Sequence, residues 1–336
     1  MAKKSTREKE FDAELKALSG KIPDKYYQIL VRFFECYKKA ALSFDEAVPT
    51  LFLFLQLIQQ QFREPFVFEP YHQKVRRPID YYRFGLDFIS PLCDLPHSRI
   101  LGSMHLDAIA GYLKRKENVV LLANHQTETD PQAISILMEK THPDIASSII
   151  YVAGERVVTD LMALPFSMGC DLLCIYSKRY IDFPPEEKGD KQLHNKKTMS
   201  LMSRLLQEGG KIIYVAPSGG RDRRNAKGIV EVAPFDPDSI EMFYLMAKRA
   251  KTPTHFVPFS LSTYNLLPPP ETVQRELGES RSAHRSPIHI AFAAPFDMDH
   301  FPGSDETDKT LRRQARARAI WSIVNQNYQM LNAPTL

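Results

Sequence analysis

Leu121-Leu-Ala-Asn-His-Gln-Thr-Glu-Thr-Asp-Pro131 is the stretch of sequence that decides the fold. It continues an apolar run over residues 119–123, which predicts a buried strand, and polar residues follow this run directly. Asp130-Pro131 then has the form of a helix start, with the aspartate as N-cap and the proline at the first helical position. A strand that passes through a short polar loop into a helix is the repeating unit of an α/β protein.

The same pattern recurs along the rest of the chain. Short apolar runs predict strands, and longer segments with helical spacing lie between several of them or close the chain. The predicted strands are residues 119–123, 149–153, 172–176, 212–216, 255–261 and 288–293, and the predicted helices are residues 132–139, 196–207, 239–250 and 312–331. We therefore expect an α/β domain over residues 76–336, built on a mixed sheet with at least some parallel pairs.

The first 75 residues follow a different pattern. Apolar residues recur at helical spacing up to about Phe62, and residues 44–62 are apolar on nearly every face of a helix. A basic connector that contains prolines follows at residues 65–78. The sequence therefore predicts a small helical bundle over residues 1–75, in front of the α/β domain.

Composition narrows the class of protein. With 43% hydrophobic residues the chain can bury a large core, which argues against a disordered protein. Its formal net charge of +4 does not by itself favour or exclude a class of partner. The four cysteines, at positions 36, 93, 170 and 174, show no C-x-x-C spacing, so we expect reduced structural thiols in an intracellular protein.

The chain shows no segment that predicts membrane insertion. The most apolar run, residues 51–58, is far shorter than the roughly 20 residues that span a bilayer. The charged start, with its acidic residues, argues against a secretory signal and a typical transit peptide. We expect a soluble protein of the bacterial cytoplasm, which the start favours, or of the plastid stroma after removal of a transit peptide.

The spacing His-x4-Asp in the opening stretch carries the strongest chemical indication. A tight loop of this length can fold Asp130 back onto one nitrogen of His125. The carboxylate then fixes the tautomer and stabilises the imidazolium, which leaves the other nitrogen as a general base. Taken alone, this spacing is more often an ordinary loop histidine before a helix start.

A second stretch, Ile212-Ile-Tyr-Val-Ala-Pro-Ser-Gly-Gly-Arg-Asp-Arg-Arg224, also runs from a strand into a loop. Gly219 and Gly220 let backbone N–H groups approach an anion, and Arg221 and Arg223 offer planar donors that match a phosphate. In isolation the segment also fits a solvated basic turn. Further charged residues follow two other predicted strands, and these are Arg156, Lys178 and Arg179. Because ligands of α/β sheets bind at the carboxyl ends of strands, the positions together predict one active site.

The ordered set of motifs resembles that of the glycerolipid acyltransferases. The Pro-Ser-Gly-Gly-Arg-Asp-Arg run is similar to that of the soluble glycerol-3-phosphate 1-O-acyltransferases of plastids and some bacteria, whereas more general phospholipid acyltransferases carry Pro-Glu-Gly-Thr-Arg there. The similarity extends from the helical N-terminal region to at least Asp297. The motifs are Asn124-His-Gln-Thr-Glu-Thr-Asp130, Gly154-Glu-Arg156, Ala216-Pro-Ser-Gly-Gly-Arg-Asp-Arg223 and Val257-Pro258.

This resemblance implies transfer of a fatty acyl group from acyl carrier protein, or from coenzyme A, to the sn-1 hydroxyl of glycerol 3-phosphate. The product is lysophosphatidic acid, and the reaction is the first step of glycerophospholipid synthesis. The resemblance implies no metal and no cofactor. It implies His125 as general base with Asp130 as its partner, and Arg221 and Arg223 as phosphate ligands. Arg179-Tyr180 stands where the plastid enzymes carry a Lys-His pair that helps to bind the phosphate.

Other interpretations remain open. Ser218 would be the nucleophile of a thioester or ester hydrolase, although it lacks the G-x-S-x-G elbow, and the acceptor would otherwise be a lysophospholipid. The basic stretches at residues 74–77 and 312–318 fit contact with an acidic carrier protein or with membrane headgroups, but a solvated surface is favoured. No nucleic-acid reader motif appears. The sequence does not locate the apolar groove that an acyl chain requires.

Overall fold

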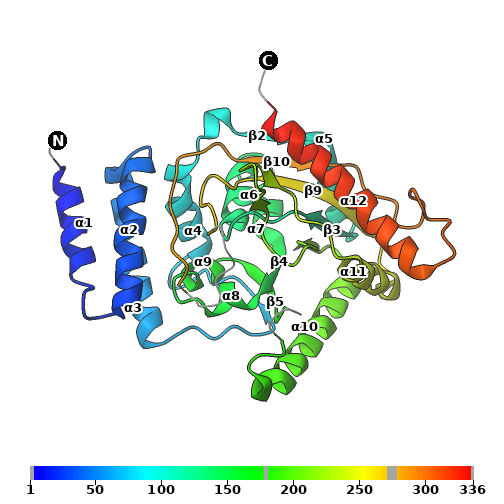
Figure 1. Cartoon of the computed structure of the whole chain (residues 1–336), viewed down its shortest axis with the longest axis horizontal. Coiled ribbons are helices and arrows are strands. Elements are labelled where there is room, and N and C mark those ends of the chain that lie inside the picture. The colour runs from blue at the N-terminus through cyan, green and yellow to red at the C-terminus, as the bar shows by residue number, and fades with distance from the viewer. Residues whose placement is uncertain (1–3, 178–180, 271–277, 334–336) are drawn as a thin grey trace.

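The computed structural model describes residues 4–177, 181–270 and 278–333. Its centre is an eight-stranded mixed sheet (Figure 1) with the strand order β1-β5-β4-β6-β3-β9-β10-β2. The strands are β1 Tyr71–His72, β2 Arg99–Leu101, β3 Asn118–Ala123, β4 Ile149–Gly154, β5 Asp171–Ile175, β6 Ile212–Val215, β9 Thr254–Ser262 and β10 His289–Phe292, and a separate hairpin joins β7 Arg223–Arg224 to β8 Val230–Glu231.

Five neighbouring strands of the sheet, from β5 through β4, β6 and β3 to β9, are parallel. β1 runs antiparallel to β5 at one edge, and β10 runs antiparallel to β9 near the other. Because parallel strands end at the same edge of a sheet, the loops that follow β3, β4, β6 and β9 meet there. The predicted α/β class with a mixed sheet is confirmed.

Alternate residues of β3 face two different helical layers. Val119 and Leu121 pack with α5 (Ser103–Lys114), α6 (Asp130–Met138) and α7 (Pro143–Ser148). Val120 and Leu122 pack on the other face, with α10 (Lys188–Glu208), α11 (Pro237–Ala250) and α12 (Lys309–Asn332). Successive side chains of a strand point to opposite faces, so a strand covered on both faces reads as an unbroken apolar run.

The N-terminal helices stand together beside this three-layer unit (Figure 1). They are α1 Thr6–Lys16, α2 Asp24–Ala40 and α3 Phe44–Arg63, followed by α4 Tyr81–Ile89. Ser5 caps the first of them, because its hydroxyl accepts from the Glu8 N–H at 3.0 Å. The predicted bundle of helices is confirmed, and α4 shares its hydrophobic core. The division of the chain into domains at residue 75 stays a prediction.

The six predicted strands are present within a few residues of their expected bounds. The same holds for the helices predicted at residues 132–139, 196–207, 239–250 and 312–331, except that α10 begins at Lys188, eight residues early. The sequence did not predict the two- and three-residue strands β1 and β2, the β7–β8 hairpin, or the helices α4, α5 and α7. Also unpredicted are the short helices α8 Glu155–Thr159 and α9 Leu164–Ser167 and the 3-10 turns Ser90–Leu92, Leu95–His97 and Pro185–Glu187. Within the described ranges, no helix has the length and apolar character needed to cross a membrane.

Candidate active site

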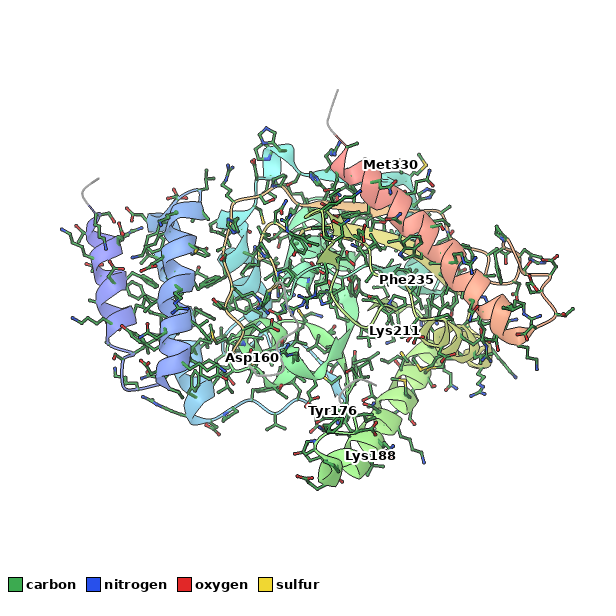
Figure 2. All side chains as sticks on the ribbon, in the orientation of Figure 1. Asp160, Tyr176, Lys188, Lys211, Phe235 and Met330 are labelled. Atoms are coloured by element: carbon green, nitrogen blue, oxygen red, sulfur yellow. The ribbon has the colours of Figure 1, made fainter. Side chains whose placement is uncertain are left out.

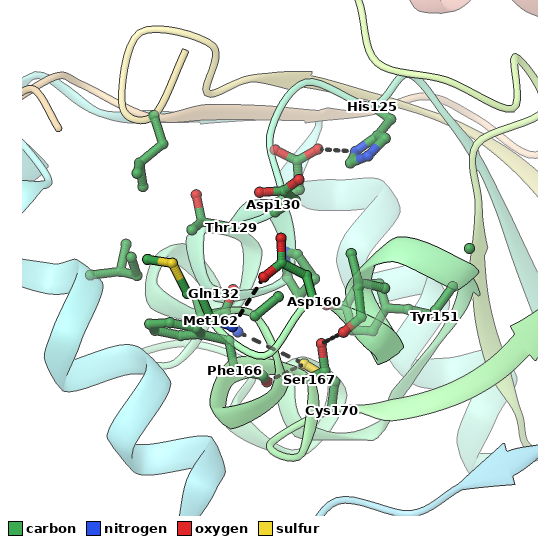
Figure 3. A pocket seen from close by; sticks show the side chains of 18 of the residues that line it. His125, Thr129, Asp130, Gln132, Tyr151, Asp160, Met162, Phe166, Ser167 and Cys170 are labelled. Atoms are coloured by element: carbon green, nitrogen blue, oxygen red, sulfur yellow. Dashed lines mark hydrogen bonds and ion pairs between the residues drawn. The ribbon is translucent and has the colours of Figure 1, made fainter. Parts of the chain in front are cut away.

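His125 and Asp130 form a hydrogen-bonded pair in the loop after β3 (Figure 3). Nδ1 of His125 lies 2.8 Å from Oδ2 of Asp130. The Asp130 side chain is 1% exposed and that of His125 is 28% exposed, so the carboxylate is enclosed while the ring reaches an open space. The loop therefore has the geometry that the His-x4-Asp spacing predicts, with Nε2 left for chemistry. Its catalytic role remains a prediction.

The carboxylate of Asp130 is held by groups on two loops. It accepts from the N–H groups of Gln126 at 2.8 Å and Thr127 at 3.1 Å, and from the hydroxyl of Thr263, after β9, at 2.6 Å. The predicted N-cap role of Asp130 is wrong, because α6 begins at this residue and Thr129 occupies the cap position. The side chain turns back toward His125 instead and orients its ring.

Asp222 connects two loops: the loop after β3 that carries His125 (the histidine loop) and the loop after β6 that carries Arg221 and Arg223 (the arginine loop). Its buried carboxylate accepts from Asn124 Nδ2 at 2.7 Å and Gln126 Nε2 at 3.1 Å, and its own N–H donates to the His125 carbonyl at 2.7 Å. Burial raises the pKa of Asp222 to about 6, although the hydrogen bond from Asn124 opposes this. The sequence analysis did not single out this residue, although it lies between the two predicted arginines.

Arg221 lies in a cluster of ion pairs. Its guanidinium donates to Glu128, in the histidine loop, at 2.9 Å and to Oε2 of Glu279 at 2.9 Å. Arg156 reaches the same Glu279 at 2.6 Å, and Arg281 binds both carboxylates. The structure thus brings together Arg156 and Arg221, which follow different strands and which the sequence predicted to share one site. It adds Glu128, Glu279 and Arg281, which the sequence analysis missed.

Arg223 differs from Arg221 in its surroundings. Its guanidinium donates to the Pro270 carbonyl. Within the described part of the chain, no carboxylate forms an ion pair with it. Burial, and then the neighbouring Arg221, lower the pKa of Arg223. A half-buried cation of this kind is favourably placed to gain an anionic ligand.

The glycine loop forms a turn. Gly219, at a φ of +62°, donates its N–H to the Ala216 carbonyl at 3.1 Å, and the Ser218 hydroxyl donates to the Gly220 carbonyl at 2.9 Å. A Cβ atom on either glycine would meet no neighbouring atom, so the turn borders open space. Gly220 therefore keeps an N–H for a ligand, because no described group accepts from it. Lys178, Arg179 and Tyr180 lie outside the described residues.

A cavity of about 200 Å³ extends from this site toward the N-terminal helices. His125, Glu128, Glu279 and Arg281 line its polar part. The remainder of the lining is mostly apolar and includes Ile29, Phe33, Phe54, Phe88 and Phe166. The sequence could not locate this space, because it lies between the helical bundle and the edge of the sheet.

A strand-end histidine–aspartate pair, arginines on the loop after β6 and an apolar cavity are features that an acyltransferase requires. A family profile described as Acyltransferase matches residues 108–262, the span from α5 to the end of β9. Over 324 residues the chain is 36% identical to a chloroplastic glycerol-3-phosphate acyltransferase of Cucurbita moschata, covering 94% of this chain and 72% of that protein.

Two further relatives carry the same description. The chloroplastic glycerol-3-phosphate acyltransferase of Spinacia oleracea is 34% identical, covering 94% of this chain and 68% of that protein. The corresponding protein of Arabidopsis thaliana is 33% identical, covering 94% of this chain and 70% of its own length. The chain therefore belongs to the family of chloroplast-type glycerol-3-phosphate acyltransferases.

Proposed function

We propose that this protein transfers a fatty acyl group from a thioester donor to the sn-1 hydroxyl of glycerol 3-phosphate, forming lysophosphatidic acid. The observation that carries this proposal is the position of the His125–Asp130 pair. The pair lines the same apolar cavity, which suits an acyl chain, as Glu128, Glu279 and Arg281 of the arginine cluster, which suits a phosphate. An enzyme that joins a phosphorylated alcohol to a fatty acid needs these two binding regions beside its base.

The acceptor binds through its phosphate. Arg221 and Arg223 provide charged donors, and Gly220 provides a backbone N–H. Arg156 donates to Glu279 and adds positive charge to the same cluster. By the resemblance in sequence, Arg179 is a further proposed ligand and Lys178 an accessory one. Charge-assisted hydrogen bonds from guanidinium groups hold a phosphate in a fixed orientation, which directs the acceptor hydroxyl toward His125.

In the proposed reaction the proton passes through Nε2 of His125, for which the described residues provide no hydrogen-bond partner. As the hydroxyl oxygen attacks the thioester carbonyl carbon, Nε2 takes the hydroxyl proton, and Asp130 stabilises the imidazolium that forms. The tetrahedral intermediate then collapses, the carbon–sulfur bond breaks, and His125 returns the proton to the departing thiolate. The hydroxyl attacks directly, so no acyl-enzyme is required.

The donor places its acyl chain in the cavity that leads to Phe33, Phe54 and Phe88. Burial of each methylene in such a space is worth about 0.8 kcal/mol, so a long chain supplies substantial binding energy. Acyl carrier protein is the proposed donor, and coenzyme A thioesters are the second candidate. The plastid stroma or a bacterial cytoplasm is the proposed location, with peripheral contact at the membrane that receives the product.

A hydrolase that uses Ser218 is less well supported. The Ser218 hydroxyl donates to the Gly220 carbonyl, and the described partner of His125 is Asp130. A nucleophile needs its base within hydrogen-bonding distance. A lysophospholipid acceptor would use the same base, and the product analysis below separates it from glycerol 3-phosphate.

The test measures thiol release from palmitoyl carrier protein and from palmitoyl coenzyme A, with and without glycerol 3-phosphate. We expect release that depends on glycerol 3-phosphate and a product acylated at the sn-1 hydroxyl. Equal release without an acceptor would support the hydrolase, and release only with a lysophospholipid would change the acceptor.

Replacement of Arg223 tests the acceptor site. We expect Arg223→Ala to raise the KM for glycerol 3-phosphate roughly ten- to hundredfold, because a charged hydrogen-bond donor to the phosphate is lost. Arg224→Ala is the matched control, since the neighbouring guanidinium donates to the Gly228 carbonyl on the surface. An unchanged KM in the Arg223 variant would remove Arg223 from the phosphate site.

A further inference from the structure

Four of the clustered side chains form a closed ring of alternating charge. Arg221 donates to Glu128 at 2.9 Å, Glu128 accepts from Arg281 at 2.5 Å, Arg281 pairs with Glu279, and Glu279 accepts from Arg221 at 2.9 Å. Two guanidinium groups are therefore held on the same two carboxylates. Because both arginines contact the same carboxylates, an anion that binds Arg221 from the cavity side also comes within reach of Arg281.

The ring is enclosed and borders the cavity. The side chains of Arg221, Arg281 and Glu279 are 10%, 13% and 3% exposed. Burial raises the pKa of Glu128 and of Glu279, but the arginines outweigh burial and hold both below their usual range. Both carboxylates are therefore ionised near neutral pH and act as internal counter-ions for the arginines.

The charges of the cluster match those of a phosphate monoester. Among the described residues of the cluster, three guanidinium groups (Arg156, Arg221 and Arg281) and two carboxylates sum to one positive charge. Arg223, whose pKa responds to both Arg221 and Arg281, adds a second. A phosphate monoester carries roughly −1.5 to −2 charges at pH 7. It can therefore neutralise the cluster when it takes over donors that Glu128 and Glu279 hold in the free protein.

Arg281 reaches the ring from a distant part of the chain. It lies between β9 and β10, 153 residues after Glu128. Gly278 donates its N–H to the Asp160 carboxylate at 2.9 Å. Its φ of +77° favours glycine, and a Cβ there would lie 2.8 Å from the ring of Tyr26, so a larger residue would be strained and would displace this ring of α2. Figure 2 shows Asp160 between the bundle and the sheet. This anchoring fixes the segment that carries Glu279 and Arg281.

We infer that Arg281 is a further phosphate-binding residue of the acceptor site, and that Glu128 and Glu279 are counter-ions which the phosphate partly displaces. This inference rests on the proposed function, because it takes glycerol 3-phosphate as the ligand. It adds a binding residue from the long connection between β9 and β10, which the sequence analysis did not link to the site. It also explains why two acidic side chains lie in a site for an anion.

The experiment compares Arg281→Ala and Arg281→Lys with wild type, using the dependence of thiol release on glycerol 3-phosphate and on the acyl donor. Arg285→Ala is the matched control, because Arg285 lies four residues further along and pairs with Asp94 at 3.0 Å. We expect Arg281→Ala to raise the KM for glycerol 3-phosphate roughly ten- to hundredfold, with little change in kcat or in the donor KM. The control should behave as wild type.

Arg281→Lys keeps the charge without the bidentate fork, so we expect an intermediate KM. If Arg281→Ala does not fold, the KM of Arg281→Lys tests the inference. Calorimetric titration of each folded variant with glycerol 3-phosphate alone should rank the Kd values as the KM values are ranked, lowest in wild type, intermediate in Arg281→Lys and highest in Arg281→Ala. A fall in kcat with unchanged KM and Kd would make Arg281 only a support for Glu128 and overturn the inference. A wild type without acceptor-dependent release would instead refute the proposed function.

Discussion

At the scale of single residues, two buried aspartates set the geometry of the site. Asp130 holds the His125 ring, and Asp222 ties the backbone of His125 to the loop that carries Arg221 and Arg223. Both carboxylates receive several hydrogen bonds from the polypeptide, which offset part of the cost of enclosing a charge. The distance between the proposed base and the proposed phosphate site is thus fixed before a substrate binds.

Asp222→Asn tests this account through pH. Because burial raises the pKa of Asp222 to about 6 in the folded protein, the carboxyl group contributes stability that is present below the unfolded pKa and lost as pH rises through 6. The difference between this pKa and the ordinary aspartate pKa of 3.8 corresponds to about 3 kcal/mol of folding free energy. We expect the unfolding free energy of wild type, relative to Asp222→Asn, to fall by about this amount between pH 4 and 7, measured by urea titration.

Asp308→Asn provides a control of opposite sign. Asp308 caps α12, and hydrogen bonds from the N–H groups of Leu311 and Thr310 lower its pKa. Its contribution is present above the unfolded pKa and is lost as pH falls. A stability difference between wild type and Asp222→Asn that does not vary with pH would contradict the enclosed position of Asp222.

At the scale of elements, much of the fold could be predicted because the strands are covered on both faces and the loops after them are polar. The His125 and Arg221 loops each follow such a strand. Glu279 and Arg281 could not be predicted, since they belong to a connection with no local pattern and meet Glu128 only through tertiary packing. The cavity escaped prediction because its walls come from the bundle, the sheet edge and the short helices between them.

The helical bundle closes the apolar part of the cavity, and this predicts a role in acyl-chain selection. Phe54 lines the cavity, whereas Phe34 is equally buried in the bundle and does not. We expect Phe54→Leu to enlarge the space and to raise the ratio of kcat/KM for an 18-carbon donor over a 14-carbon donor roughly tenfold. Ile29→Phe should fill the space and shift the ratio in the opposite direction.

Phe34→Leu is the matched control for this prediction. It makes the same substitution in the same core, so it should lower the melting temperature to a similar extent without changing the ratio between donors. A shift of equal size in both leucine variants would mean that loosening of the bundle, and not the cavity wall, changes the donor preference.

At the scale of the whole molecule, the two basic stretches are largely engaged within the protein. Lys74 pairs with Asp171 at 2.7 Å, and Arg76 pairs with Asp80 at 2.8 Å. Arg316 is buried, where it donates to the Met298 carbonyl at 3.0 Å and pairs with Glu241. Side chains held in this way contribute less to an electrostatic surface for a partner, which favours a structural and solvated role for both stretches.

Charge reversal at the more accessible arginines tests this interpretation. We expect Arg312→Glu combined with Arg318→Glu to leave the ratio of activity with carrier-bound and coenzyme A-bound donors within about twofold of wild type. The measurement is kcat/KM for each palmitoyl donor at low ionic strength, where a carrier contact would matter most. A selective loss of at least tenfold with the carrier-bound donor would instead identify this helix as the docking surface.

The central claim is that His125 is the base of an acyl transfer to glycerol 3-phosphate. The measurement that tests it most directly is acceptor-dependent thiol release by His125→Ala beside wild type, with calorimetric binding of glycerol 3-phosphate to both. The account predicts a fall in kcat of roughly a hundred- to ten-thousandfold, with binding of glycerol 3-phosphate retained. Near-normal turnover in His125→Ala would contradict it.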